Sequence, residues 1–162
     1  MPKIITNTSP IYYLHQIDAL LWLPELFTGI STPSAVEREL RQGREKGHNA
    51  PDLSNYAWIH IENPSHIPSE WLSLDLGGGE LAVLSLSLEK PERILLIDER
   101  IARRIAEAAG ITVWGTLRIL LEAKSKGLTA QVTSHIDRLK ESGMWISDSI
   151  HQRILALAGE TA

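Results

Sequence analysis

Short runs of mainly apolar residues alternate along this chain with longer segments in which apolar residues recur every three or four positions. The runs at residues 3–6, 29–31, 93–97 and 111–114 predict strands, and the alternating residues 58–61 predict another. Capping residues, helical spacing and terminal glycines predict helices that open at residues 7–10, 32–33 and 80, and further helices at residues 101–109, 116–123, 130–140 and 147–157. Strands that alternate with helices predict an α/β fold with a central parallel sheet covered on both faces.

The whole chain, residues 1–162, is expected to form one domain. Its 43% hydrophobic content is enough for one core, and neither a repeat nor a low-complexity linker divides it. The polar residues 41–54 predict an exposed loop after a helix that ends near Gly43. The helices after about residue 128 carry apolar stripes, so we expect them to pack on this domain or to mediate self-association as a homodimer. The stripes consist of Ile136, Leu139, Ile150, Ile154 and Leu157.

Composition removes several classes of site and of protein. The chain has no cysteine, which excludes disulfides, thiolate metal sites and cysteine nucleophiles, so any metal must be held by oxygen or imidazole ligands. No signal-peptide core and no apolar run long enough for a membrane span is present, so we expect a soluble, cytoplasmic protein with no membrane partner. The formal net charge of -4 argues against a broad basic surface for nucleic acid, so any RNA contact is expected to be local.

Four polar residues lie at strand ends or in the helices that leave them: Asn7, Glu39, Glu80 and Asp98. Ligands of parallel sheets bind beyond the carboxyl ends of the strands, where we expect these side chains to meet. Magnesium and manganese favour oxygen ligands, and carboxylates can hold such an ion together with a water that attacks a phosphodiester. The pattern therefore predicts a site for one of these metals.

Each of the four residues also has a plainer interpretation. Asp98 could cap the helix that begins at Glu99, and Asn7 could cap the first helix. Glu80 follows three glycines, so its charge could complement the helix dipole and nothing more. Glu39 could be a solvated surface acid. The residues themselves leave these alternatives open.

Other motifs give weaker indications of a functional site. The three glycines before Glu80 fit neither GxxxxGK[ST] nor GxGxxG, so a phosphate loop is not indicated. The six histidines show no HExxH pairing, and Ser9 has no neighbouring histidine that would form a nucleophilic triad. Three arginines beside Asp98 could steer a phosphate backbone, although exposed helix arginines are usually only solvated. They are Arg100, Arg103 and Arg104.

Four segments together resemble a prokaryotic branch of the PIN domain family. They are IITNTSPIYYL, PSAVERELRQG, LGGGELAVLSLSL and ILLIDERIARRIAEAAGITVWGTLRILL, and the likeness covers residues 3 to 127. Its most specific parts are the spacing from LGGGE to LLIDERIARR and the GTL after the next strand.

This resemblance implies a three-layer α/β/α fold and an acidic pocket that binds Mg²⁺ or Mn²⁺ for RNA hydrolysis. Many members of the family are toxins paired with an antitoxin. Asn7, Glu39, Glu80 and Asp98 match the first to fourth acidic positions, and Ser9 matches the small hydroxyl residue that accompanies the first. The departure is Asn7, where the family has aspartate: an amide oxygen can ligate a cation but supplies no charge and cannot act as a general base.

Two hypotheses from different classes follow. In the first, the protein is a metal-dependent endoribonuclease, either by itself or as the toxin of a toxin–antitoxin pair. Its Glu39, Glu80 and Asp98 are catalytic and hold the metal together with Asn7. In the second, it is a non-catalytic protein of PIN fold whose acidic cleft binds RNA or a protein partner. A Rossmann-like nucleotide domain would share the parallel sheet and Asp98, but the chain lacks the glycine fingerprint of that fold. Divalent metal binding in the cleft separates the first two.

Overall fold

The computed structural model of the chain, which describes residues 1–160, is built around a five-stranded sheet whose neighbouring strands are all parallel. The strands are β1 (Lys3–Thr6), β2 (Gly29–Thr32), β3 (Ile59–Ile61), β4 (Ile94–Leu96) and β5 (Val113–Trp114), in the order β3-β2-β1-β4-β5. The predicted strands are therefore confirmed, although β4 and β5 are shorter than the apolar runs that indicated them. Parallel pairing places all the carboxyl ends at one edge of the sheet.

Eight α-helices accompany the sheet within the described residues. They are α1 (Thr8–Gln16), α2 (Trp22–Leu26), α3 (Ser34–Glu45), α4 (Gly78–Glu89), α5 (Arg100–Ala108), α6 (Thr116–Ser125), α7 (Thr133–Glu141) and α8 (Asp148–Leu157). Two 3₁₀ turns, Leu53–Asn55 and Ser69–Ser73, lie in the loops. The short helix α2 was not predicted, because five residues give too little periodicity to recognise.

The helix predicted to open at residues 32–33 was expected to end near Gly43, and the structure extends it by two residues. Helix α3 continues to Glu45, and the glycine that turns the chain out of it is Gly47, with φ of 89°. Gly43 faces the loop that follows: a Cβ added to it would lie 3.6 Å from Ala50 Cβ. The sequence offered two glycines close together, and only packing decided which of them ends the helix.

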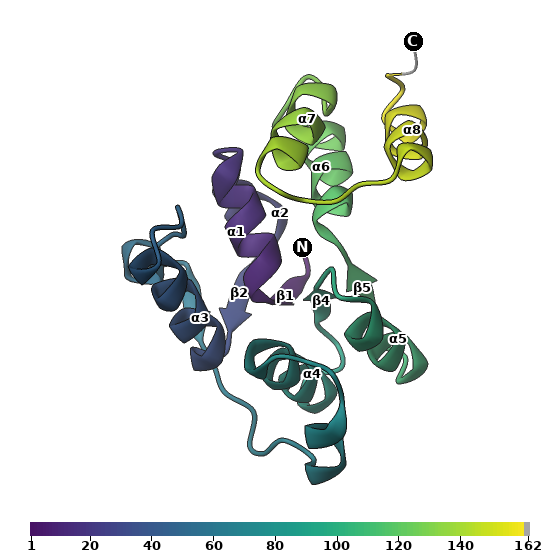
Figure 1. Cartoon of the computed structure of the whole chain (residues 1–162). Helices are drawn as coiled ribbons and strands as arrows, with labels where there is room; N and C mark the ends of the chain where they lie inside the picture. Colours follow the sequence, from purple (N-terminus) through teal and green to yellow (C-terminus); the bar gives the residue numbers. More distant parts are fainter. Residues whose placement is uncertain (161–162) are drawn as a thin grey trace.

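The helices form two layers with the sheet between them (Figure 1). Helices α4 and α5 cover one face, and α1, followed by α6 and α7, covers the other. Helix α3 lies beside α1 and also contacts α4 near the sheet edge. This arrangement confirms the predicted three-layer α/β/α fold, and no helix within residues 1–160 is long and apolar enough to cross a membrane.

The strand order reverses direction between β1 and β4. From β1 the chain proceeds through β2 to β3, and it then returns across the sheet to β4 and continues outward to β5. Helix α4 makes this return and is buried along most of its length, from Gly79 to Ser87, because it packs on β1 and β4 and lies between α3 and α5. Such a reversal leaves a crevice beyond the carboxyl ends of the two central strands, which is where parallel sheets bind ligands.

The carboxyl-terminal helices pack on the rest of the molecule with part of their apolar stripes. Helix α7 contacts α1, and α8 contacts α6. Ile136, Leu139 and Ile154 are buried, whereas Ile150 is 45% exposed and Leu157 is 65% exposed. The stripes thus serve packing at three positions and leave an apolar surface at two.

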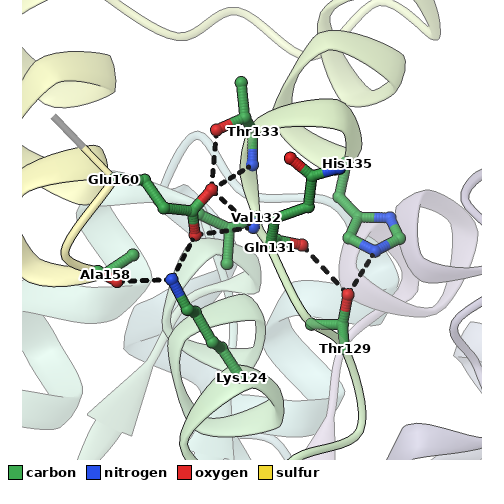
Figure 2. Close-up of polar contacts among 8 residues, drawn as sticks. All are labelled: Lys124, Thr129, Gln131, Val132, Thr133, His135, Ala158 and Glu160. Atoms are coloured by element: carbon green, nitrogen blue, oxygen red, sulfur yellow. Dashed lines mark hydrogen bonds and ion pairs between the residues drawn. The ribbon is translucent and has the colours of Figure 1, made fainter. Parts of the chain in front are cut away.

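A polar cluster at Glu160 ties the end of the described chain to the start of α7 (Figure 2). The Glu160 carboxylate accepts hydrogen bonds from the backbone N–H groups of Val132 and Thr133, from the Thr133 hydroxyl and from Lys124 Nζ at 2.7 Å. Burial alone would raise the pKa of Glu160, but these donors outweigh it and lower the pKa to about 2. The carboxylate therefore acts as a tertiary cap for α7.

Candidate functional site

Asn7 lies directly after β1 at the reversal of strand order. Its backbone N–H donates to the Leu96 carbonyl of β4 at 3.0 Å, which joins the ends of the two central strands. The residue is only 4% exposed, and within residues 1–160 its side chain makes no capping hydrogen bond to α1. Its Oδ1 atom is buried and has no hydrogen-bond partner in the described chain. Capping therefore does not account for Asn7, and its orphaned oxygen is open to an added donor or a cation.

Glu39 projects from α3 and connects three helices. Its Oε1 atom accepts a hydrogen bond from the Gly79 backbone N–H at 2.7 Å, and its Oε2 atom accepts one from the Thr8 hydroxyl at 2.5 Å. A Cβ added to Gly79 would lie 2.6 Å from Glu39 Oε1, so any larger residue there would displace this carboxylate. Glu39 is thus a positioned carboxylate at the start of α1 and α4, not a freely solvated surface acid.

Glu80 stands in the first turn of α4, next to Glu39. The two carboxylates approach the same glycine: a Cβ on Gly77 would lie 3.4 Å from Glu80 Oε1 and 3.9 Å from Glu39 Oε1. Burial raises the pKa of Glu80, and the nearby charges of Glu99, Glu39 and Asp75 raise it further against a hydrogen bond with the Gly77 backbone. Glu80 Oε2 is buried without a hydrogen-bond partner in the part of the chain that is described. A cation bound here would offset the repulsion between the carboxylates and would give Glu80 Oε2 a partner.

Asp98 lies just beyond β4 and is held by the start of α6. Its Oδ1 atom accepts from the Thr116 backbone N–H at 2.9 Å, and its Oδ2 atom accepts from the Thr116 hydroxyl at 2.7 Å. The helix that follows Asp98 in sequence, α5, is capped by Glu99, whose carboxylate accepts from the Ala102 N–H at 2.6 Å. The plainer interpretation of Asp98 as the cap of α5 is therefore wrong.

One of the three neighbouring arginines lies against Asp98. Arg103 donates from Nη1 to the Ile97 carbonyl at 2.9 Å, whereas Arg100 and Arg104 are exposed. A Cβ on Gly115 would meet both Arg103 Nη1 and Asp98 Oδ1 at 2.9 Å, so this cation and this carboxylate share one small space that requires glycine. Among the described residues no ion pair joins the two side chains, and the hydrogen bond of Arg103 goes to the Ile97 carbonyl.

All four predicted site residues lie at the carboxyl edge of the sheet, but they are not equally close. Glu39 and Glu80 adjoin each other, while Asn7 and Asp98 follow the neighbouring strands β1 and β4. Ser9, in the first turn of α1, lines a pocket together with Glu39. Within residues 1–160 no three histidine, aspartate or glutamate side chains are grouped as a ready metal site. Protein donors reach both oxygens of Glu39 and of Asp98, each of which keeps a further lone pair, whereas Asn7 Oδ1 and Glu80 Oε2 have no donor in the described residues.

The structure also places residues at this edge that the sequence analysis did not single out as functional. Glu99 is the charged neighbour with the largest effect on the pKa of Glu80. The pKa of Tyr13, in α1, is raised mainly by burial and also by the negative charge of Asp98. Glu99 had a signal, since it adjoins Asp98 in the run IDER. Tyr13 had none, because its role depends on how α1 is set against β4.

Among three comparisons with known proteins, one found a match. No curated protein and no solved structure matches the chain significantly. A family profile described as PIN domain matches residues 3–160. PIN domains are generally nucleases that use divalent metal ions, and a five-stranded parallel sheet between helical layers is consistent with that nuclease-type fold. The chain therefore belongs to the PIN domain family.

Proposed function

We propose that this protein is a metal-dependent endoribonuclease that hydrolyses phosphodiester bonds of RNA. The observation that carries the proposal is the pair of buried, orphaned oxygens, Asn7 Oδ1 and Glu80 Oε2, at the edge where the strand order reverses. Six buried side-chain atoms of the described residues lack a partner, and these two are the ones that lie at the carboxyl edge of the sheet. A buried polar atom without a partner calls for one. An oxygen-binding cation is such a partner, and the carboxylates of Glu39 and Asp98 flank this edge.

The residues suit Mg²⁺ or Mn²⁺, because every candidate ligand is an oxygen: Asn7, Glu39, Glu80 and Asp98. When bound, the ion supplies charge neutralisation for the phosphate and an activated water. The protein supplies fixed geometry. Thr8 and Gly79 hold Glu39, and Thr116 holds Asp98, so neither carboxylate must be ordered when substrate arrives. Ser9 adds a hydroxyl beside Glu39 for contact with substrate.

Family membership and exposed apolar residues in the carboxyl-terminal region indicate protein partners. Trp145 is 83% exposed, and it precedes α8, which exposes Ile150 and Leu157. Large apolar side chains gathered on a surface mark contacts with other proteins. We propose that this surface joins two copies of the chain, and that the protein acts as the toxin of a toxin–antitoxin pair.

A second function is favoured by Asn7. The chain has an amide where the family has an acid, and the two best-fixed carboxylates already have protein donors on both oxygens. Fewer charges lower the affinity for a divalent ion. A non-catalytic PIN protein that binds RNA or a protein partner in this cleft would have these features.

The deciding experiment measures cleavage of an unstructured RNA and Mn²⁺ binding by calorimetry in the same preparations. Wild type should cleave only with added Mg²⁺ or Mn²⁺. Asp98→Asn and Glu80→Gln should abolish cleavage and weaken Mn²⁺ binding. Asn7→Asp should strengthen Mn²⁺ binding, because another charged oxygen faces the cation. Asp137→Asn, which changes an exposed acid of α7, is the matched control and should have no effect.

Glu80→Gln guards against a folding artefact, since Asp98 also caps α6 whereas Glu80 Oε2 has no protein partner in the described residues. Cleavage that resists chelators and survives both substitutions would exclude the metal mechanism. Absence of cleavage and of metal binding in every variant, Asn7→Asp included, would favour the binding protein.

A further inference from the structure

A pocket of about 300 Å³ lies between α1 and α3, directly beside the carboxylate edge. It shares Thr8, Ser9 and Glu39 with the candidate site, and Tyr13 links it to Asp98, whose charge acts on the Tyr13 hydroxyl. This volume is at the lower end of the range for small-molecule pockets. The lining residues are Thr8, Ser9, Tyr12, Tyr13, Glu39, Leu40, Gly43, His48 and Ala50.

Two tyrosine rings give this pocket its chemical character. Tyr12 and Tyr13 are half-buried, and their ring centroids are 5.4 Å apart with an interplanar angle of 72°. Leu40 and Ala50 add buried apolar walls, and Gly43 contributes no side chain. A pocket with aromatic and apolar walls and a few polar atoms suits a flat, mostly neutral group.

The charges around the pocket favour a nucleobase over a phosphate as its occupant. A phosphate inside it would face the Glu39 carboxylate, whereas a neutral base would not be repelled. Outside it, Arg41 and Lys46 are exposed at the end of α3, near His48. Arg44 differs, since it donates to the Pro51 carbonyl at 2.7 Å. The exposed charges at this end of α3 are thus Arg41, Lys46 and one acid, Glu45, and the aromatic surface lies within the pocket. Two cations beside an aromatic pocket are a combination that holds single-stranded nucleic acid.

We propose that this pocket binds an unpaired nucleobase of the RNA strand next to the scissile phosphate, with stacking on Tyr12. The inference rests on the proposed function for its substrate and deepens it, because it makes Tyr12 the residue that recognises one base beside the cleaved bond. A base inside a duplex is stacked on its neighbours and is not free to enter a side pocket. Arg41 and Lys46 then contact flanking phosphates.

The test measures binding separately from cleavage, so that failure of one is not mistaken for failure of the other. Fluorescence anisotropy in the presence of a chelator would compare three probes: a labelled single-stranded oligoadenylate, its duplex with oligouridylate, and the same single strand with abasic nucleotides. Wild type should bind the single strand best. Tyr12→Leu should weaken that binding about 5- to 150-fold, the usual effect of removing one stacking partner, while Tyr12→Phe should retain it.

Two further variants keep the test specific. Tyr56→Leu removes a half-buried tyrosine that packs on Trp58 outside this pocket, and it should leave RNA affinity unchanged. Gly43→Leu puts a side chain next to Ala50 inside the pocket without altering either ring. It should weaken RNA binding, and the melting temperature of the same sample shows whether the fold has tolerated the larger side chain beside Ala50.

Equal affinity for single-stranded, duplex and abasic probes would overturn the inference, as would equal effects of Tyr12→Leu and Tyr56→Leu or no binding of RNA by the wild type. Cleavage with an unchanged KM in Tyr12→Leu and Gly43→Leu would overturn it while leaving the nuclease proposal intact. Ring-dependent binding without any cleavage would support the pocket and contradict the nuclease instead.

Discussion

Replacement of Gly79 by alanine tests whether α4 and Glu39 are as close as the structure has them. A Cβ at this position would lie 2.6 Å from Glu39 Oε1 and 2.7 Å from Oε2, well inside van der Waals contact. The carboxylate must move, and the 2.7 Å hydrogen bond from the Gly79 N–H is then lengthened or lost. Gly78, the preceding residue of α4, is a matched control, because among the described residues nothing lies within 4 Å of a Cβ placed there.

The two substitutions should change stability in opposite directions. The Glu39 carboxylate can swing away from the new Cβ, and the hydrogen bond to this charged acceptor that is then lost contributes about 1.5–3 kcal/mol. Alanine is favoured over glycine in a helix by up to about 1 kcal/mol, which partly offsets the loss at position 79 and is the main effect at position 78. We expect Gly79→Ala to lower the free energy of unfolding by roughly 1–3 kcal/mol and Gly78→Ala to leave it unchanged or raise it.

Thermal unfolding by circular dichroism would measure the difference, which should be roughly 2–12 °C in Tm for a chain of this length. Mn²⁺ calorimetry on the same samples should show weaker binding for Gly79→Ala only, since its Glu39 carboxylate is displaced. Equal melting temperatures for the two variants, or a more stable Gly79→Ala, would refute the close contact and the positioning of Glu39.

Two further predictions concern buried carboxylates. Glu80→Gln should raise the free energy of unfolding of the metal-free protein at pH 7. Burial and neighbouring carboxylates raise the pKa of Glu80, so the folded state loses stability as pH rises and this side chain becomes charged. Glutamine stays neutral at every pH and avoids that loss. Urea unfolding that shows the variant less stable than wild type would contradict this. Glu160→Ala should lower the free energy of unfolding at pH 7 by about 2 kcal/mol, because the cap of α7 and the partner of Lys124 are lost. Since the pKa of Glu160 falls from 4.5 to about 2, the gap should close as pH drops from about 4.5 toward 2, and a gap independent of pH would refute the assignment.

The sequence by itself determined the elements of the fold and the positions of the candidate ligands. Strand and helix periodicity are local properties of the chain, so the apolar run before Asp98 and the helical spacing after Glu80 identify β4 and α4 without tertiary information. The resemblance supplied the family. Helix α2 was missed because its five residues are shorter than the pattern that reveals a helix.

Only the tertiary structure decided which groups meet. The strand order depends on how the helices pack, and it alone places Asn7 and Asp98 at the ends of neighbouring strands. Glu39 bonds to Thr8 and Gly79, which lie 31 and 40 positions away, and Asp98 caps α6 instead of the adjacent α5. Spacing in sequence carries no information about such contacts, because a carboxylate binds whichever free N–H or hydroxyl the packing brings within reach.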